Sequence, residues 1–281
     1  MTAPNDLAEQ LREIDAERYL ASLYLPEEIR RAVQILYLFD CEIARIPNLV
    51  SEPMPGEIRL QWWRDILQSE RAGEALANPL ASALLHTIEE FDLPREGFKA
   101  YLDARVFDLY NDPMPNKGTY EGYLGETASF WFLNACLCAG ITRSKELSDA
   151  AGHAGVAFGM ARNLAQVSRW SAQGQVFAPA ELLKEYELQV SDWLYVKPDE
   201  RHRKVVIALC DETNKHLNMA KNAVSALPKK TGIMFLPLVF TQSLIIKIRK
   251  SNLRVFSEPL QLGPLKRQYL ALRAGIKGNL K

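Results

Sequence analysis

The protein has 281 residues, of which 48% are hydrophobic, 24% are charged and 9% are aromatic. This composition is that of an ordinary globular protein, and it excludes long disordered or collagen-like regions. The 34 Lys and Arg residues balance the 34 Asp and Glu residues. A protein that grips nucleic-acid phosphates needs many uncompensated cations, so we expect no nucleic-acid partner.

The zero net charge hides a gradient along the chain. Residues 1–100 contain ten Lys or Arg and eighteen Asp or Glu, whereas residues 241–281 contain nine Lys or Arg and one acidic residue, Glu258. The basic C-terminal region either meets an anionic partner or neutralises the acidic first third in the folded protein. The polar, acidic N-terminus lacks the apolar core of a secretory signal. We therefore expect a cytoplasmic protein, with peripheral contact at the inner face of a membrane through the basic C-terminal region as one option.

Apolar residues recur at three- and four-residue spacing along most of the chain, and this periodicity predicts helices. The first long helix starts after Pro26 and cannot continue easily past Pro47. The predicted helices are Glu27–Ile46, Gly56–Arg71, Pro79–Phe91, Phe98–Tyr110, Tyr120–Ala139, Leu147–Ser171, Glu200–Leu227, Ile233–Arg249 and Leu260–Ala274. No long apolar/polar alternation requires a sheet, although Gln175–Phe177 could form a short strand. We predict an all-α fold with one domain over residues 1–281.

Four cysteines in a chain of this length do not form a disulfide framework, and the nearest pair, Cys136 and Cys138, has no second Cys or His pair to complete a zinc site. We expect all four to be reduced core residues. The four histidines are isolated in the sequence. His216 has Glu212 four residues before it, which we interpret as a pair on a helix surface.

Glycines at three- and four-residue spacing lie on one apolar predicted helix, at Gly152, Gly155 and Gly159. A phosphate-binding loop needs a lysine and a preceding strand, which this segment lacks. Glycine removes side-chain bulk, so the pattern predicts close approach of another helix.

Three segments, in order, resemble the squalene/phytoene synthase family of head-to-head prenyltransferases. They are RYLASLYLPEEIRRAVQILYLFDCEIARI (18–46), then LQWWRD (60–65) with FKAYLDARVFDLY (98–110) and TYEGYLGETASFW (119–131), and GVAFGMARNLAQ…GQVFAPAELL (155–183). The resemblance covers roughly residues 18–185. It implies an isoprenoid-synthase-like helical bundle around a central cavity. The binding residues it implies are Tyr37, Glu42, Arg45, Asn48, Trp63, Arg64, Tyr123, Glu126, Arg162 and Asn163.

Catalysis in this family uses Mg²⁺ held between a diphosphate and two carboxylate clusters, because magnesium prefers oxygen ligands and stabilises the leaving group. The positions of the first cluster carry Ala44, Arg45 and Asn48, and residues 43–51 contain no Asp or Glu. The second cluster falls at Val167 and at Trp170 or Ser171, and residues 150–180 contain no Asp or Glu. We therefore predict no metal cofactor and no catalytic residues.

Substitute ligands are few. Asp40 and Glu42 are two residues apart on a helix and cannot face one ion together. We expect Glu42 to pair with Arg45 and Asp108 to cap or pair structurally, whereas Glu126 is a lone carboxylate. Beside the second cluster, Arg162 and Arg169 indicate direct binding of an anion, or they are solvated surface residues.

The string FDCEIARI with the later IRLQWWR resembles a divergent, non-catalytic branch of the family that includes a mitochondrial complex I assembly factor. The resemblance implies binding of a respiratory complex subunit or an isoprenoid-like lipid, and help in building respiratory complex I. The alternatives are a Mg²⁺-dependent enzyme that condenses prenyl diphosphates with Glu42, Asp108 or Glu126 as ligands, and a polyprenyl carrier.

The segment GIMFLPLVFTQSLIIKIRK (232–250) joins an apolar helix to a cationic end. It is either a buried core helix whose cations suit the helix dipole or a segment that docks on an anionic membrane leaflet.

Overall fold

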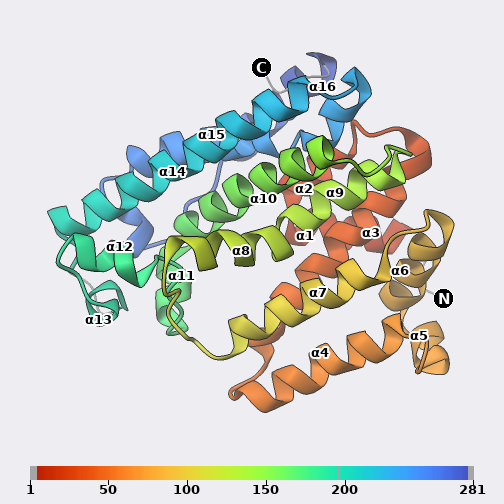
Figure 1. The fold of residues 1–281 in the computed structure, drawn as a ribbon, viewed down its shortest axis with the longest axis horizontal. Helices are drawn as coiled ribbons and strands as arrows, with labels where there is room; N and C mark the ends of the chain where they lie inside the picture. Colours follow the sequence, from red (N-terminus) through yellow and green to blue (C-terminus); the bar gives the residue numbers. More distant parts are fainter. Residues whose placement is uncertain (1–4, 195–196, 278–281) are drawn as a thin grey trace. The chain divides into compact units, whose positions relative to one another are not determined.

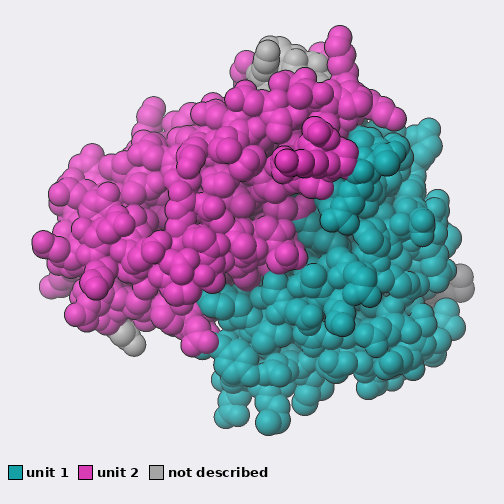
Figure 2. Space-filling model, in the orientation of Figure 1, with its two compact units in different colours: residues 1–110, 130–143 teal, residues 111–129, 144–281 magenta. Residues whose placement is uncertain are grey.

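The computed structural model describes residues 5–194 and 197–277, and these residues form helices joined by loops (Figure 1). No strand occurs within the described ranges, which confirms the all-α prediction. Contacts divide the chain into two compact units, residues 1–110 with 130–143 and residues 111–129 with 144–281 (Figure 2). We describe each unit by itself. The single-domain arrangement over residues 1–281 stays a prediction.

Unit 1 is built around one long helix with a nearly continuous apolar surface. The helices of unit 1 are α1 (Asn5–Ile14), α2 (Ala16–Ser22), α3 (Glu27–Ala44), η1 (Ile46–Leu49), α4 (Pro53–Leu67), α5 (Ala72–Ala77), α6 (Pro79–Glu90), α7 (Arg95–Arg105), η2 (Val106–Leu109) and nearly all of α9 (Ser129–Cys138). Helix α3 follows Pro26 as predicted, and its apolar residues are buried on almost every side. The Phe39 ring lies edge-on to Trp63, with ring centroids 4.9 Å apart. Pro26 is the N-cap of α3, as its position before the helix predicts. Packing on several sides places α3 at the centre of unit 1.

Unit 2 is organised around a second buried helix. Its helices are α8 (Lys117–Thr127), α10 (Lys145–Ala165), α11 (Val167–Ala172), α12 (Ala180–Glu185), α13 (Val190–Leu194), α14 (Glu200–Ser225), η3 (Lys229–Phe235), α15 (Leu238–Arg249), η4 (Arg254–Phe256) and α16 (Pro264–Lys277). Helix α10 packs against α8, α14 and α15. A Cβ atom added at Gly155 would lie 2.2 Å from the Ser129 backbone nitrogen, and one at Gly159 would lie 2.4 Å from Leu124 Cδ2. The predicted close approach is confirmed at Gly155 and Gly159 and is wrong at Gly152, where an added Cβ would meet nothing within 4 Å.

Several predicted boundaries are wrong. The helix expected over Tyr120–Ala139 is interrupted at Ala128 between α8 and α9, and the one over Leu147–Ser171 is interrupted at Gln166 between α10 and α11. Each break is a single turn residue, and helical periodicity locates such boundaries poorly. The Gln175–Phe177 segment does not form the predicted short strand. Met114 N donates to Val176 O at 3.3 Å, but this bond is not part of a strand pairing.

The apolar segment before the basic tail is a buried core helix. It bends by 46° between η3 and α15, at Pro237. The cations at its end are held by unit 2, because Lys247 donates to the Gln261 carbonyl and Arg249 pairs with Asp211. Within the described ranges no single helix is long and apolar enough to cross a membrane, and the bent pair of η3 and α15 meets that test by length and composition alone.

The four cysteines are free and buried, as predicted. Burial raises the pKa of Cys136 and Cys138 to about 12 each. Their thiols are therefore protonated at neutral pH and are core residues rather than nucleophiles.

Candidate functional site

The expected binding residues of unit 1 do not form one cluster. Tyr37 is buried beneath the Arg18 guanidinium, whose central carbon lies 5.0 Å from the ring centroid. Glu42 and Arg45 form an exposed ion pair with an Nε–Oε2 distance of 2.9 Å, as predicted. Asn48 is exposed in η1, where its backbone N–H donates to the Arg45 carbonyl.

The two residues taken from the tryptophan–arginine segment have structural partners in unit 1. Trp63 is 4% exposed and packs on Phe39. Arg64 pairs with Asp103, with 2.8 Å between Nη2 and Oδ1. The structure therefore gives both residues a packing or pairing role within unit 1.

A buried charge network lies one helical turn before the first-cluster positions of α3. The Asp40 carboxylate accepts from Arg18 Nη1 at 2.7 Å, from Arg105 Nη2 at 2.6 Å and from the Tyr101 hydroxyl at 2.7 Å. Arg18 also pairs with Asp15 at 2.8 Å, and the other arginine is held by Asp108.

These partners decide the charge state of Asp40. Burial opposes ionisation of its carboxyl group, but the charges of Arg18 and Arg105 and the Tyr101 hydroxyl outweigh burial and lower its pKa to about 2. Asp40 is therefore ionised and saturated by protein donors, which leaves it unsuited to hold a metal. Asp108 likewise has the structural pairing expected of it, with 3.0 Å between Arg105 Nη1 and its Oδ2.

The expected binding residues of unit 2 lie along α8 and α10. Asn163 donates from Nδ2 to the Tyr120 hydroxyl at 3.1 Å. The Tyr123 ring lies tilted beside Phe177, with ring centroids 5.8 Å apart. The Arg162 guanidinium lies over the Phe158 ring at 5.1 Å. The fourth residue, Glu126, is exposed.

A small aromatic pocket occupies the second-cluster region of unit 2. Residues that line it are Tyr120, Met160, Asn163, Leu164, Val167, Trp170, Gln175, Phe177, Ala178, Trp193 and Leu209. Its cavity volume is about 20 Å³, which is room for a group of a water molecule's size. Gln175 is 4% exposed, and neither its Oε1 nor Trp170 Nε1 has a hydrogen-bond partner among the described residues. One small group that accepts from the indole and donates to the amide would satisfy both atoms.

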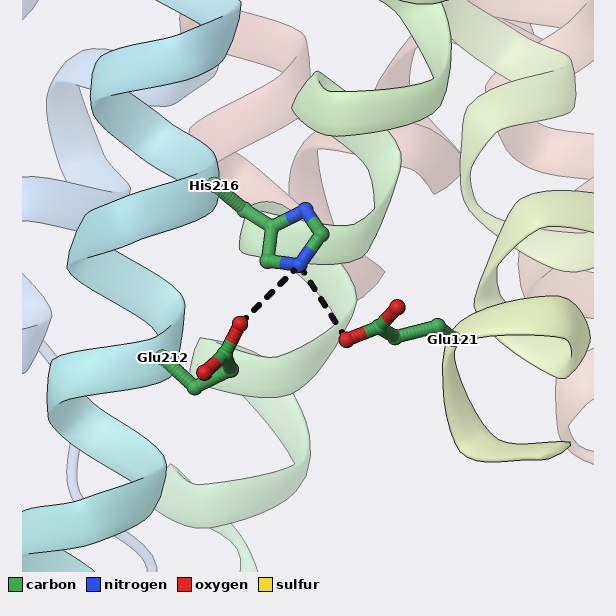
Figure 3. A group of neighbouring side chains, drawn as sticks. All are labelled: Glu121, Glu212 and His216. Atoms are coloured by element: carbon green, nitrogen blue, oxygen red, sulfur yellow. Dashed lines mark hydrogen bonds and ion pairs between the residues drawn. The ribbon is translucent and has the colours of Figure 1, made fainter. Parts of the chain in front are cut away.

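A cluster that sequence reasoning missed lies elsewhere in unit 2. Figure 3 shows His216 and Glu212 from α14 and Glu121 from α8 pointing toward one another. His216 Nε2 lies 3.3 Å from Glu121 Oε1 and 3.4 Å from Glu212 Oε1. The expected pair of His216 with Glu212 is confirmed, but His216 is only 6% exposed, so its placement on the helix surface is wrong. The second carboxylate belongs to Glu121, 95 positions from His216, and helical spacing cannot predict a contact over that distance.

The three side chains of this cluster have the types and separations that can hold a metal ion. However, the Lys117 ammonium lies 2.7 Å from Glu212 Oε1 and 3.6 Å from Glu121 Oε1. Burial disfavours the Lys117 ammonium, but Glu212 and Glu121 outweigh burial and raise its pKa. A protein cation therefore already neutralises these carboxylates.

Two histidines that are isolated in the sequence meet in this cluster. His153 Nδ1 lies 3.0 Å from His216 Nδ1. One of these nitrogens must carry the hydrogen and the other must accept it, so both rings cannot be imidazolium in this geometry. Burial and the neighbouring His216 lower the pKa of His153.

The fold and these residues together define a class of protein. The chain belongs to the squalene/phytoene synthase family, whose model matches residues 11–266. The squalene synthase HpnC from Alicyclobacillus acidocaldarius superposes with a TM-score of 0.70 at 16% identity, and the match covers 98% of this chain and 94% of that one. At this identity the match demonstrates a shared fold.

Two relatives with curated roles point in different directions. Complex I assembly factor 6 of Rattus norvegicus is 26% identical over 253 residues, which are 90% of this chain and 76% of that protein. The presqualene diphosphate synthase of Rhodopseudomonas palustris is 23% identical over 231 residues, which are 81% of each chain. The family thus includes both an assembly factor and an enzyme among the proteins that this chain resembles.

Magnesium does not fit the residues at the two cluster positions. The first cluster would be Ala44, Arg45 and Asn48, which offer a methyl group, a cation and a single amide. At the second, Val167 and Trp170 line the small aromatic pocket. Magnesium needs several oxygen ligands with compensating negative charge, and these side chains supply almost none.

Proposed function

We propose that this protein is a non-catalytic member of the squalene/phytoene synthase family that assists assembly of respiratory complex I by binding a protein client or an isoprenoid-like lipid. One observation carries the proposal: no Asp or Glu occurs in residues 43–51 or in residues 150–180. Ionisation of an allylic diphosphate places negative charge on the leaving oxygens. A metal held by carboxylates stabilises that charge by several kcal/mol, so loss of the ligands removes the main source of catalysis.

The assembly role rests on the similarity to complex I assembly factor 6, which extends over 90% of this chain. A scaffold freed from metal binding keeps its helical surfaces for recognition, and function lies in such surfaces rather than in the fold itself.

The aromatic pocket is too small, as it stands, to hold a prenyl chain. Its volume of about 20 Å³ accommodates a group of a water molecule's size, far less than a prenyl chain. A lipid would require Trp170 or Phe177 to move, at the loss of their packing in unit 2.

The first test asks whether the protein turns over prenyl diphosphates. Purified protein is incubated with farnesyl or geranylgeranyl diphosphate and Mg²⁺, and released diphosphate is measured. The presqualene diphosphate synthase of Rhodopseudomonas palustris serves as the positive control. We expect no release above the protein-free background. Turnover would overthrow the non-catalytic proposal.

The second test concerns complex I. The gene is deleted, and NADH:quinone oxidoreductase activity and the isoprenoid profile are measured in the same membranes. We expect deficient oxidoreductase activity with normal isoprenoids, and recovery when the wild-type chain is expressed. Intact oxidoreductase activity in the deletion strain would rule out the assembly role, and altered isoprenoids would favour a lipid-carrier or enzymatic role.

An active condensing enzyme is the second candidate, because the chain is 23% identical to a presqualene diphosphate synthase. Its expected ligands are poorly placed: Glu42 and Asp108 are paired with arginines, and Glu126 is exposed. If diphosphate is released in the first test, Glu212→Gln distinguishes a metal site at His216 from one at Glu42. Loss of turnover in Glu212→Gln but not in Glu42→Gln would place the metal at the His216 cluster.

A further inference from the structure

The last helix, α16, exposes four bulky apolar side chains to solvent, which is unusual for a helix of a globular protein. Ala271 and Ala274 are buried, whereas Leu265 is 82%, Tyr269 61%, Leu272 52% and Ile276 76% exposed. We call these four exposed side chains the α16 stripe. Burying one such side chain normally stabilises a protein, so four of them left in solvent on one helix need a reason.

The α16 stripe is continuous. Its residues are four, three and four positions apart, which places them within about 60° of one helix face. The opposite face carries the buried Ala271 and Ala274 with the half-buried Arg267 and Leu270, and α16 contacts α15. The stripe is therefore an apolar ridge that points away from unit 2.

All charged residues of α16 are cations. The helix contains four cations and no acidic residue, and no acidic residue occurs between Pro259 and its end. Lys266 and Arg273 are exposed, and their helical positions flank the stripe on one side. Within the described ranges no carboxylate pairs with Lys266, Arg267 or Arg273.

The rest of the basic C-terminal region behaves differently. Arg249 is paired with Asp211, and Arg254 with Glu258. Arg249 and Arg254 are thus already compensated inside unit 2, whereas Lys266 and Arg273 of α16 have no carboxylate partner within the described ranges.

The start of α16 is anchored to unit 2. The segment before it is fixed by a backbone bond from Leu260 N to Ala165 O of 2.7 Å, and Leu260 and Leu262 are buried. The stripe is therefore presented by a helix that is attached at its start, not by a loose tail.

We propose that α16 is a membrane-surface helix that inserts the α16 stripe into the boundary of an anionic bilayer, with Lys266 and Arg273 at the level of the lipid phosphates. An apolar stripe flanked by cations, without acidic residues, is the pattern of helices that lie in the plane of a membrane interface. The uncompensated positive charge favours an anionic lipid surface over a protein surface that has few acidic residues. It also disfavours a second copy of the same helix, because the two sets of cations would repel each other. This inference does not depend on the assembly role or on the absence of catalysis.

Vesicle flotation tests the proposal. The full-length protein is mixed with vesicles of phosphatidylcholine alone or of phosphatidylcholine with 30% phosphatidylglycerol, about equal in size. We expect recovery with the anionic vesicles to exceed recovery with the neutral ones by at least tenfold, and to fall with added salt. Equal recovery with both, or recovery with neither, would overturn the proposal.

Two double variants separate the apolar and the electrostatic contributions. Leu265→Gln with Leu272→Gln removes half of the stripe, and Lys266→Gln with Arg273→Gln removes the flanking charge. We expect each to weaken partitioning into anionic vesicles by about tenfold or more. The matched control is Met54→Gln with Ile58→Gln, because Met54 is 72% and Ile58 is 64% exposed in α4. It should bind as the wild type does.

These substitutions are on exposed side chains, so the folded state is checked by circular dichroism melting and should be unchanged. If the Leu265→Gln, Leu272→Gln variant binds anionic vesicles as well as the wild type, the stripe is not the contact. Sedimentation velocity covers the competing occupant: a wild-type dimer that this variant converts to a monomer, without vesicle binding, would make the stripe a self-association face and refute the proposal.

Insertion is also measured directly. The four native cysteines are buried, so a cysteine introduced at position 272 can be labelled selectively with an environment-sensitive fluorophore. We expect its emission to shift to shorter wavelength with anionic vesicles, and a label at position 76, which is exposed in α5, to stay unchanged. No shift at position 272 would contradict insertion.

Discussion

The two units replace the family's carboxylate clusters in opposite ways. In unit 1 the neighbourhood of the first cluster is charged and internally paired, with Asp40 held by Arg18, Arg105 and Tyr101. In unit 2 the second-cluster region is aromatic and uncharged, and two of its polar atoms have no hydrogen-bond partner within the described residues. One region thus depends on charge pairing and the other on packing.

The largest effect should come from breaking the charge network of unit 1. Arg18→Met leaves Asp15 and Asp40 buried without their shared cation, and we expect the free energy of unfolding to fall by about 3–5 kcal/mol. Urea denaturation measures this change. Arg12→Met, which breaks an exposed pair with Glu9, is the control and should cost less than about 0.5 kcal/mol. A loss below about 1 kcal/mol for Arg18→Met would mean that unit 1 does not depend on this network.

Acid should weaken the same network. The pKa of Asp40 lies at about 2 in the folded protein against an ordinary 3.8, so its contribution is complete above pH 4 and is lost as the pH falls toward 2. The shift corresponds to about 2 kcal/mol. Urea titrations between pH 5 and pH 2.5 measure it, and the difference between wild type and Asp40→Asn should shrink as the pH falls. A constant difference would contradict the assigned pKa.

Packing in unit 2 is tested on one helix. Gly155→Ala places a methyl group against the Ser129 backbone and should destabilise by about 1–3 kcal/mol. Gly152→Ala, where a Cβ meets nothing within 4 Å, should be neutral or slightly stabilising. Thermal unfolding of both variants gives the comparison. Equal effects would show that α10 does not rely on close backbone approach.

The smallest effects compare the two regions directly. Tyr101→Phe removes a hydroxyl that donates to Asp40, and we expect a loss of about 1–2 kcal/mol. Trp170→Phe removes an indole N–H that has no described partner together with part of a ring that packs on Phe177, and we expect a loss of about 1 kcal/mol from packing alone. Both are measured by urea denaturation. A larger loss for Trp170→Phe would indicate that the indole binds a group in the aromatic pocket.

Helix class and much of the pairing on single helices were predictable. Helical periodicity located α3, α10, α14 and α15, and the spacing of Glu42 and Arg45 predicted their ion pair. The breaks at Ala128 and Gln166 were not predictable from helical periodicity, because neither position carries a proline that would end a helix. Of the ten expected binding residues, Tyr37, Glu42, Arg45, Trp63 and Arg64 are packed or paired within unit 1, Asn48 is exposed, and a binding role for any of them stays a prediction.

Distant contacts decided the clusters. Asp40 and Tyr101 are 61 positions apart, and His153 and His216 are 63 apart. Neither helix spacing nor composition brings such residues together in a prediction. The local signal for the His216 cluster was Glu212, one turn earlier on α14. This spacing did not reveal that His216 is buried.

The amino-acid sequence alone determined that the chain is helical and that its two metal positions lack carboxylates, because both depend on residue identity at short spacing. The tertiary structure decided that the arginines around Asp40 are compensated and that His216 is buried beside Glu121. It also decided that four large apolar side chains of α16 are exposed while Ala271 and Ala274 are buried. Which side of a helix is covered depends on the neighbours it packs against, and these come from segments far along the chain.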